Sequence, residues 1–211
     1  MMPVMLDLAT LPWEFSLRLI LIRHGEPEQE AKGRCYGSLD VGLSESGREQ
    51  IQSKLASIRN LRAEALYASP LKRAMESAAI VAASLRLEAA ICAELREINF
   101  GSFEGLTYED VEKLYPEEYR VWMERPTEIK FPQGESFAQV KTRVLKFKEL
   151  LLTAHRGQTV IVVSHGGANR IILAEALAMP DPAIFRIGQS YAALNIIDYL
   201  VGSPVVRLVN G

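Results

Sequence analysis

The stretch Leu19-Ile20-Leu21-Ile22-Arg23-His24-Gly25-Glu26 determines how the rest of the chain is interpreted. Its first four residues are apolar and partly β-branched, which predicts a buried strand over residues 18–23. The glycine then allows a sharp turn, so His24 is expected at the carboxyl end of that strand, where open α/β sheets bind ligands. A histidine beside an arginine at such a position is a candidate nucleophile facing an anion, although a surface loop is the alternative from this stretch alone.

A second histidine follows the same pattern. The apolar run 159–163 predicts another buried strand, and Ser164-His165-Gly166-Gly167 comes directly after it. The chain has only three histidines, so two of them at strand ends, each before a glycine, indicate a shared site. His24, His165 and Cys35 are also a conceivable zinc set, but the neighbouring arginines would repel a dication, and no metal is expected.

Composition limits the class of protein. The chain has 211 residues, 48% of them hydrophobic and 24% charged, with a net charge of −2, which predicts one soluble globular domain. This charge gives no reason to expect nucleic-acid or membrane partners. The N-terminal residues 1–17 are apolar but lack a basic region, so they predict an extension before a single domain at 18–211, and a cytoplasmic protein. Cys35 and Cys92 are expected to be free thiols.

Strands alternate with helices along the chain, which predicts a three-layer α/β/α sandwich with a mostly parallel central sheet. Ser69-Pro70 is interpreted as a helix start, with the serine as the cap and the proline in the first turn. Short helices within residues 100–135 are expected to form a small inserted cap. The remaining expected strands are 65–68, 89–93, 192–199 and 204–209, and the main helices are 45–58, 71–85, 136–154 and 168–178.

Five separated motifs stand at these strand ends and helix starts. They are Leu-Ile-Arg-His-Gly-Glu at 21–26, Leu-Ser-Glu-Ser-Gly at 43–47, Ser-Pro-Leu-Lys-Arg-Ala at 69–74, Leu-Arg-Glu at 95–97 and Ser-His-Gly-Gly at 164–167. Together, and in this order, they resemble the histidine phosphatase superfamily, the phosphoglycerate-mutase-like proteins, from Leu19 to about Leu177. The resemblance implies that family's sandwich fold.

The resemblance also implies roles for individual residues. His24 is expected to become phosphohistidine, Glu97 to act as the general acid, and three residues to complete the phosphate pocket: Arg23, Arg73 and His165. Guanidinium groups suit a phosphoryl dianion because they stay charged and offer paired donors. The nearby cations are expected to lower the pKa of His24, and protonated His165 to share the charge stabilisation, so neither metal nor cofactor is expected. Gly166 and Arg34 are expected to contact substrate.

One departure from the family concerns the loop after the first motif. Many members carry an asparagine there that contacts the phosphate, whereas this chain has none between Glu26 and Leu43. The corresponding place is near Glu30, which leaves that contact without an assigned residue.

The expected partner is a small-molecule phosphomonoester. The segment 101–134 is short and its arginines are isolated, which favours a phosphatase over a cofactor-dependent phosphoglycerate mutase. Motifs near Cys35, Ile98 and Glu135 are similar to the α-ribazole phosphatase branch, which removes a 5′-phosphate in cobalamin nucleotide-loop assembly. A broad-specificity sugar phosphatase and a phosphate-binding regulatory module remain alternatives, and a homodimer is left open. The cap aromatics either cover an aromatic base or pack the cap itself: Phe100, Phe103, Tyr108, Tyr115, Tyr119 and Trp122.

Overall fold

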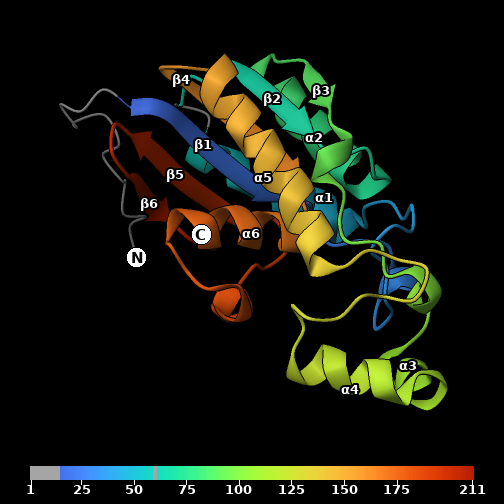
Figure 1. Ribbon diagram of the computed structural model, residues 1–211. Helices are drawn as coiled ribbons and strands as arrows, with labels where there is room; N and C mark the ends of the chain where they lie inside the picture. Colours follow the sequence, from blue (N-terminus) through green and yellow to red (C-terminus); the bar gives the residue numbers. More distant parts are fainter. Residues whose placement is uncertain (1–14, 59–60) are drawn as a thin grey trace, which may run out of the picture.

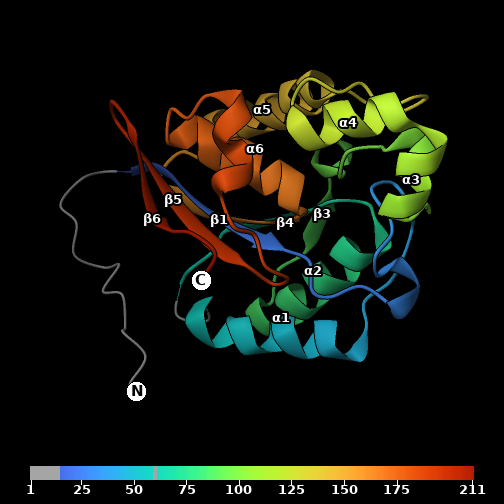
Figure 2. The ribbon, with the colours of Figure 1, turned by 90° about the horizontal axis from the view of Figure 1, so that it is seen from below.

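The computed structural model describes residues 15–58 and 61–211, which build a central sheet between two helical layers (Figures 1 and 2). The sheet has the strand order β3-β2-β4-β1-β5-β6. Its first four strands in that order are parallel to one another, β5 is antiparallel to β1, and β6 is antiparallel to β5. The predicted mostly parallel sandwich is confirmed. The bounds are β1 (Phe15–Arg23), β2 (Ala65–Ala68), β3 (Ala89–Ile91), β4 (Gln158–Ser164), β5 (Leu194–Leu200) and β6 (Pro204–Leu208).

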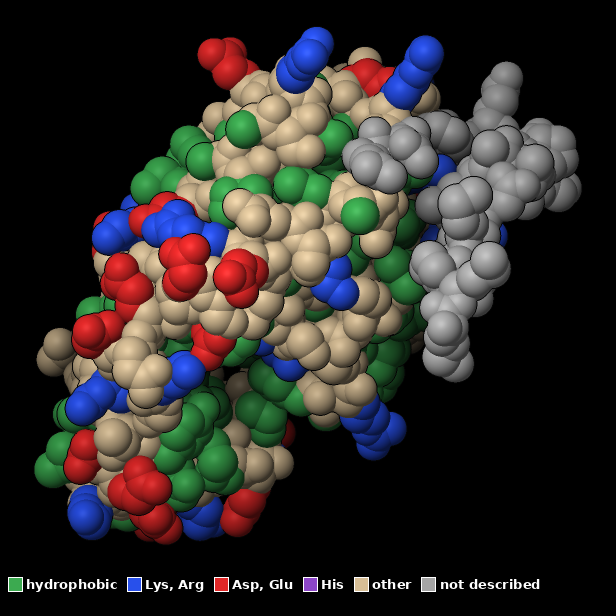
Figure 3. Space-filling view, turned by 180° about the vertical axis from the view of Figure 1, so that it is seen from behind, with side chains coloured by type: hydrophobic (Ala, Val, Ile, Leu, Met, Phe, Trp, Pro, Cys, Tyr) green, Lys and Arg blue, Asp and Glu red, His purple; other side chains and the backbone are tan. Residues whose placement is uncertain are grey.

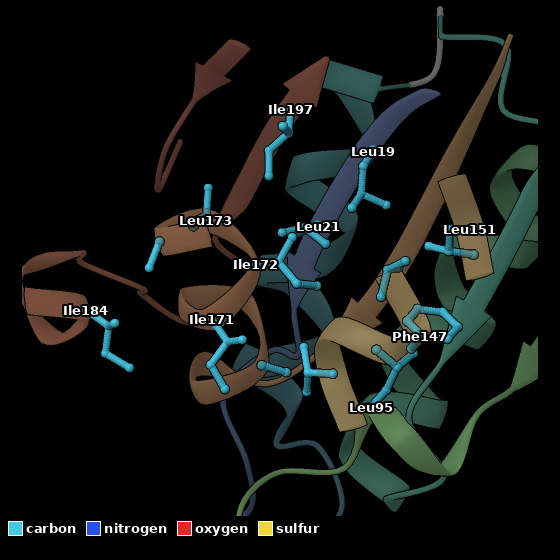
Figure 4. Packing of buried hydrophobic residues seen from close by; sticks show 14 of the residues in the cluster. Leu19, Leu21, Leu95, Phe147, Leu151, Ile171, Ile172, Leu173, Ile184 and Ile197 are labelled. Carbon is cyan, nitrogen blue, oxygen red and sulfur yellow. The ribbon is translucent and has the colours of Figure 1, made fainter. Parts of the chain in front are cut away.

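Two helices cover each face of the sheet. Figure 2 shows α5 (Phe137–Ala154) and α6 (Gly166–Ala176) on one side, with α1 (Glu45–Ile58) and α2 (Lys72–Leu85) on the other. Alternate residues of β1 point to opposite faces, as the strand period of two requires. Leu19 and Leu21 pack toward Ile172 and Phe147 (Figure 4), while Ile20 and Ile22 join the cluster under α1 and α2. The sheet is therefore buried on both faces. A ligand can bind only at its edges.

Strand register brings the candidate site together. In the parallel pair β1 and β4, Arg23 stands opposite Ser164, so His24 and His165 leave the sheet side by side. In the pair β2 and β4, Ala68 stands opposite Val163, which puts Ser69 at the same edge. Three strands thus deliver their next residue to one place, the carboxyl edge of the parallel sheet.

The first strand begins earlier than predicted. Residue 17 already pairs with β4 and β5, so residues 15–17 belong to the sheet and not to an extension. The rest of the predicted extension, 1–14, lies outside the described residues, and the division into domains stays a prediction. Among the described helices, none has the length and apolar character needed to cross a membrane.

The interpretation of Ser69-Pro70 as the start of a helix was wrong. Helix α2 begins at Lys72, and its first amide donates to Asp40 Oδ1 at 2.7 Å, so a distant loop residue caps it. Ser69 does not cap the helix: its hydroxyl accepts from the Leu71 amide at 3.3 Å and lies 2.8 Å from a ring nitrogen of His165. Helix α6, in contrast, begins two residues before the predicted position, directly after His165.

Residues 100–135 form a small lobe beside the sheet's edge, at the lower right of Figure 1. It contains α3 (Tyr108–Leu114) and α4 (Pro116–Glu124), as predicted, and a capping box at Thr107 starts the first of them. The lobe has its own apolar cluster around Phe103 and Phe131, separate from the two clusters of the sheet. We call residues 100–135, the range predicted from the sequence, the cap.

Candidate active site

His24 is buried, with 2% of its surface exposed, and its two ring nitrogens are in different states. Its Nδ1–H donates to the carbonyl oxygen of Gly25 at 2.7 Å. Its Nε2 accepts a hydrogen bond from Arg73 Nε at 3.3 Å. The proton therefore sits on Nδ1, and Nε2 carries a lone pair, as a nucleophile requires.

Arg73 is fully buried and holds both the histidine and the loop that follows β1. Its Nη1 donates to Leu39 O at 2.8 Å, and its Nη2 donates to Tyr36 O and Gly37 O at 3.1 and 2.8 Å. The guanidinium also lies 5.1 Å from the ring centroid of Tyr36. Carbonyl and ring contacts fix the orientation of this cation, and one Nη1 hydrogen remains for a ligand.

Arg23 approaches the same place from β1. Its Nη1 donates to Gln189 O, and its guanidinium carbon lies 4.4 Å from the ring centroid of Tyr191. Its Nε is buried and has no hydrogen-bond partner within the part of the chain that the structure describes. A buried cationic donor without an acceptor is costly, which indicates that an anion completes the site.

His165 lies against His24, with 5.1 Å between the ring centroids. Its Nε2 and the Ser69 hydroxyl are 2.8 Å apart, while its Nδ1 is buried and, among residues 15–58 and 61–211, unpartnered. His165 does not itself line the cavity described below, so it supports the site from behind His24. Ser69 is the contact that the sequence interpretation missed, because Ser-Pro resembles a helix cap.

Glu97 enters the site from the loop after β3. Its Oε2 accepts from the Gly167 amide at the start of α6, and its Oε1 accepts from the Ile98 amide, both at 3.1 Å. A Cβ on Gly167 would lie 2.3 Å from Glu97 Oε1, so the glycine makes room for the carboxyl group. Of the neighbouring candidates, only Glu97 lines the cavity; Glu94 and Glu104 do not.

A cavity of about 460 Å³ joins these groups to the cap. Arg23, His24, Arg73 and Glu97 all line it, and so does Arg34, whose Nη1 donates to Gly105 O in the cap at 2.7 Å. In Figure 3, hydrophobic side chains gather where the lobe at the lower left meets the body of the molecule. The rest of the wall is largely apolar and includes Phe100, Tyr108, Trp122, Met123, Phe131, Phe137, Ile171, Ile184 and Phe185.

The cap aromatics divide between the two predicted roles. Tyr108 and Trp122 are stacked, with centroids 5.2 Å apart, and both line the cavity together with Phe100. Phe103, Tyr115 and Tyr119 belong to the cluster inside the cap and do not line the cavity, whereas Phe100 and Trp122 line the cavity and also pack against this cluster.

Gly166 lies between two guanidinium groups. A Cβ there would be 3.0 Å from Arg170 Nη1 and 3.5 Å from Arg23 Nε, so glycine leaves room for both guanidinium groups at the start of α6. Sequence reasoning missed Arg170, which lines the cavity. Its place in the first turn of the helix predicted at 168–178, which follows His165, was the available signal.

Two other arginines lie outside the cavity. Arg120 pairs with Glu117, and Arg125 with Glu128, within and just after α4, and neither lines the cavity. Glu30, near the place of the family's asparagine, is exposed and does not line the cavity either. No cluster of three metal-ligating side chains occurs in the described ranges.

Burial governs the charge of both histidines. It lowers the pKa of His24 well below the usual value, and the charges of Arg73 and Arg23 lower it further. Burial is also the largest cause of the lowered pKa of His165, and the charges of Arg73 and His24 lower it further. The predicted direction for His24 agrees, with burial as the main cause, whereas the lowered pKa of His165 is contrary to the expected protonated ring.

This charge state predicts a pH-dependent stability. Unfolded histidines titrate near pH 6.5, whereas the folded rings stay neutral below it, so the unfolded chain binds more protons as pH falls. Between pH 6.5 and 5.5 the free energy of unfolding should therefore fall by about 2 kcal/mol for the two together. Urea denaturation of the protein and of His24→Gln/His165→Gln measures this, and an equal pH slope in both would contradict it.

Comparisons with known proteins all point to phosphatases. The family model described as "Histidine phosphatase superfamily (branch 1)" matches residues 19–211. Phosphoserine phosphatase 1 of Hydrogenobacter thermophilus is 35% identical over 181 residues, 86% of each chain. The adenosylcobalamin/alpha-ribazole phosphatase of Escherichia coli is 30% identical, over 92% of this chain and 96% of the other. The alpha-ribazole phosphatase structure from Shigella flexneri superposes with a TM-score of 0.83 at 28% identity, over 92% and 96% of the two chains.

Proposed function

Because the chain belongs to the histidine phosphatase superfamily and is a phosphatase, we propose that it hydrolyses phosphomonoesters through a phosphohistidine at His24, without a metal ion. The observation that carries this proposal is the unprotonated Nε2 of His24, held beside Arg73 in a buried, cationic corner of the cavity. The presence of His24, Arg73 and Glu97 together at the cavity argues against a non-catalytic phosphate-binding module.

The first step forms the phosphoenzyme. Phosphoryl oxygens take the open donors of Arg23 and Arg73, and His24 Nε2 attacks phosphorus as the bond to the leaving oxygen breaks. The Ser69 hydroxyl donates to His165 Nε2, which leaves the hydrogen of this neutral ring on Nδ1, and the ring packs against that of His24. The carboxyl proton of Glu97 goes to the leaving oxygen, and an alcohol departs.

The second step returns the enzyme to its starting state. Water attacks the phosphorus of phosphohistidine, and Glu97, now a carboxylate, takes a proton from that water. The bond between phosphorus and Nε2 breaks, and its electron pair returns to the ring, where Arg73 Nε again donates to it. Inorganic phosphate then leaves the cavity.

Glu97→Gln should slow hydrolysis in proportion to the basicity of the leaving group. An alkoxide needs a proton as it leaves, so kcat for glycerol 2-phosphate should fall by about 10³-fold. A 4-nitrophenolate needs little help, so kcat for p-nitrophenyl phosphate should fall by about tenfold, limited by the water step. Steady-state phosphate release with both substrates measures the difference.

Glu94→Gln is the matched control, because that carboxylate is three residues away and bonds to the Cys92 thiol outside the cavity. Equal losses with both substrates in Glu97→Gln would contradict the proton-donor role. Gly167→Ala, which crowds Glu97 Oε1 without changing its charge, should reproduce the leaving-group dependence in weaker form.

For the substrate, we propose α-ribazole 5′-phosphate or a phosphomonoester of similar shape. The long apolar wall with the stacked pair Tyr108 and Trp122 supports a large, aromatic leaving group. A relative and a solved structure named for alpha-ribazole phosphatase support it as well. The ion-paired Arg120 and Arg125 argue against the carboxylate grip of a phosphoglycerate mutase.

O-phosphoserine is the second candidate, because a phosphoserine phosphatase is 35% identical and two arginines at the cavity, Arg34 and Arg170, suit a carboxylate. A panel of α-ribazole 5′-phosphate, O-phosphoserine, 3-phosphoglycerate and a hexose phosphate, compared by kcat/KM, separates the candidates. Preference for α-ribazole 5′-phosphate by about tenfold or more supports our proposal; preference for phosphoserine replaces it.

A further inference from the structure

Arg143 on α5 makes a set of contacts that the proposed reaction does not yet use. Its Nε and Nη2 donate to the two carboxylate oxygens of Glu135 at 2.9 and 2.8 Å, a two-pronged ion pair. Burial raises the pKa of Glu135, but the hydrogen bonds and charge of Arg143 outweigh it and hold the pKa below the usual value. The pair is therefore ionised at neutral pH, and its geometry is fixed by both groups.

The remaining hydrogens of Arg143 all go to the segment that carries Glu97. Nη1 donates to Glu94 O at 2.7 Å and to Arg96 O at 2.6 Å, and Nη2 donates to Glu97 O at 3.1 Å. All five N–H groups of Arg143 are thus used. Three of the five acceptors are carbonyl oxygens within residues 94–97. A lysine has one nitrogen and cannot reproduce this arrangement.

Glu135 holds the same segment from its other side. Its carboxylate accepts from the Asn99 amide at 3.0 Å, and its own amide donates to Asn99 O at 2.9 Å. These bonds join the two ends of the cap, where the backbones are so close that a Cβ on Gly134 would lie 2.3 Å from Asn99 O. Glu97 is the last residue of the stretch held by Arg143, and it lies two residues before Asn99, which Glu135 holds.

We propose that Arg143 and Glu135 form a clamp that positions Glu97 for proton transfer to the leaving group. The inference rests on the proposed role of Glu97 as the proton donor. Arg143 does not line the cavity and touches no reacting atom, so it is a positioning residue. Without the clamp, the Glu97 carboxyl keeps only its two amide contacts, on a loop with no strand or helix to hold it.

The clamp has a kinetic signature of its own. A proton donor must stay within hydrogen-bond reach of the leaving oxygen, and a displacement of about 1 Å can cost about 10²-fold in rate. That cost falls only on substrates that need the proton. Loss of the clamp should therefore lower kcat for alkyl phosphates, leave KM nearly unchanged, and affect p-nitrophenyl phosphate much less.

The test uses Arg143→Met on the full chain, with kcat and KM measured for glycerol 2-phosphate and p-nitrophenyl phosphate. We expect kcat to fall by about 50-fold for the first substrate and by less than about fivefold for the second. Lys141→Met is the matched control. Lys141 is on the same helix as Arg143, and its Nζ pairs with Asp181 Oδ1 at 2.6 Å, away from the segment that carries Glu97. Equal losses for both substrates in Arg143→Met would overturn the proposal.

A double variant separates positioning from general support of the fold. If Arg143 acts through Glu97, then Glu97→Gln/Arg143→Met should be no slower than Glu97→Gln alone. Multiplied losses would show an independent role and overturn the clamp. Should Arg143→Met fail to fold, Glu135→Gln keeps the side-chain shape while weakening the ion pair, and it should show the same leaving-group dependence at about tenfold.

The two proposals fail in different ways. If Glu97→Gln shows leaving-group dependence and neither clamp variant does, the clamp is wrong and the proton donor stands. If Glu97→Gln itself shows no such dependence, the role of Glu97 is wrong, and the clamp proposal falls with it.

Discussion

Replacing His24 with alanine should lower kcat for p-nitrophenyl phosphate by about 10⁴-fold or more, because no other group on the described chain offers phosphorus an unprotonated nitrogen in this cavity. His165 is oriented by Ser69 and does not line the cavity, so it is not a substitute nucleophile. The reaction would have to proceed by direct attack of water, assisted only by the remaining cations.

Phosphate release by purified His24→Ala, with far-ultraviolet circular dichroism as a check on folding, measures this effect. His155→Ala is the matched control, since that histidine bonds to Tyr67 and Gln158 at the opposite end of β4 and should retain the activity of the unaltered protein. Activity above about one per cent in a folded His24→Ala protein would contradict the role of nucleophile.

The second large effect is expected at Arg73. Arg73→Met keeps the aliphatic stem but removes the donor to His24 Nε2 and three bonds to loop carbonyls. Loss of the charge weakens transition-state stabilisation, and loss of the carbonyl contacts loosens one wall of the phosphate corner. We expect kcat/KM for p-nitrophenyl phosphate to fall by about 10³-fold.

Arg73→Lys should recover little of this loss, because one ammonium group cannot bond to the histidine and to three carbonyls at once. The matched control is Arg48→Met, which removes an ion pair with Glu76 on the outer surface of α1 and α2. A loss below about tenfold in Arg73→Met, or full activity in Arg73→Lys, would remove Arg73 from the phosphate corner.

Much of this architecture was predictable because short-range sequence patterns, such as apolar runs and helix caps, agree with the fold. Apolar runs before His24 and His165 predict strands, and parallel neighbours in register carry the residues that follow to one edge. The long helix after Ser136 and the short ones in the cap begin at residues whose capping pattern is visible in the sequence. These features depend on neighbours within a few residues.

The rest depends on contacts between distant segments. Ser69 has the local pattern of a helix cap, but Asp40, from the loop before α1, caps α2 in its place. Tyr36 and Tyr191, which flank the two arginines, carry no short-range motif. The division of the cap aromatics into wall and core likewise depends on how α3 and α4 fold back, which side-chain type alone does not decide.

The most direct test of the account is the identity of the phosphorylated residue. Rapid mixing with p-nitrophenyl phosphate, followed by a neutral denaturing quench and peptide mass spectrometry, captures the intermediate during turnover. We predict one acid-labile phosphoryl group on His24, present at higher occupancy in Glu97→Gln because the water step is slowed. A phosphoryl group on another residue, or none on His24 while substrate is being consumed, would contradict the account.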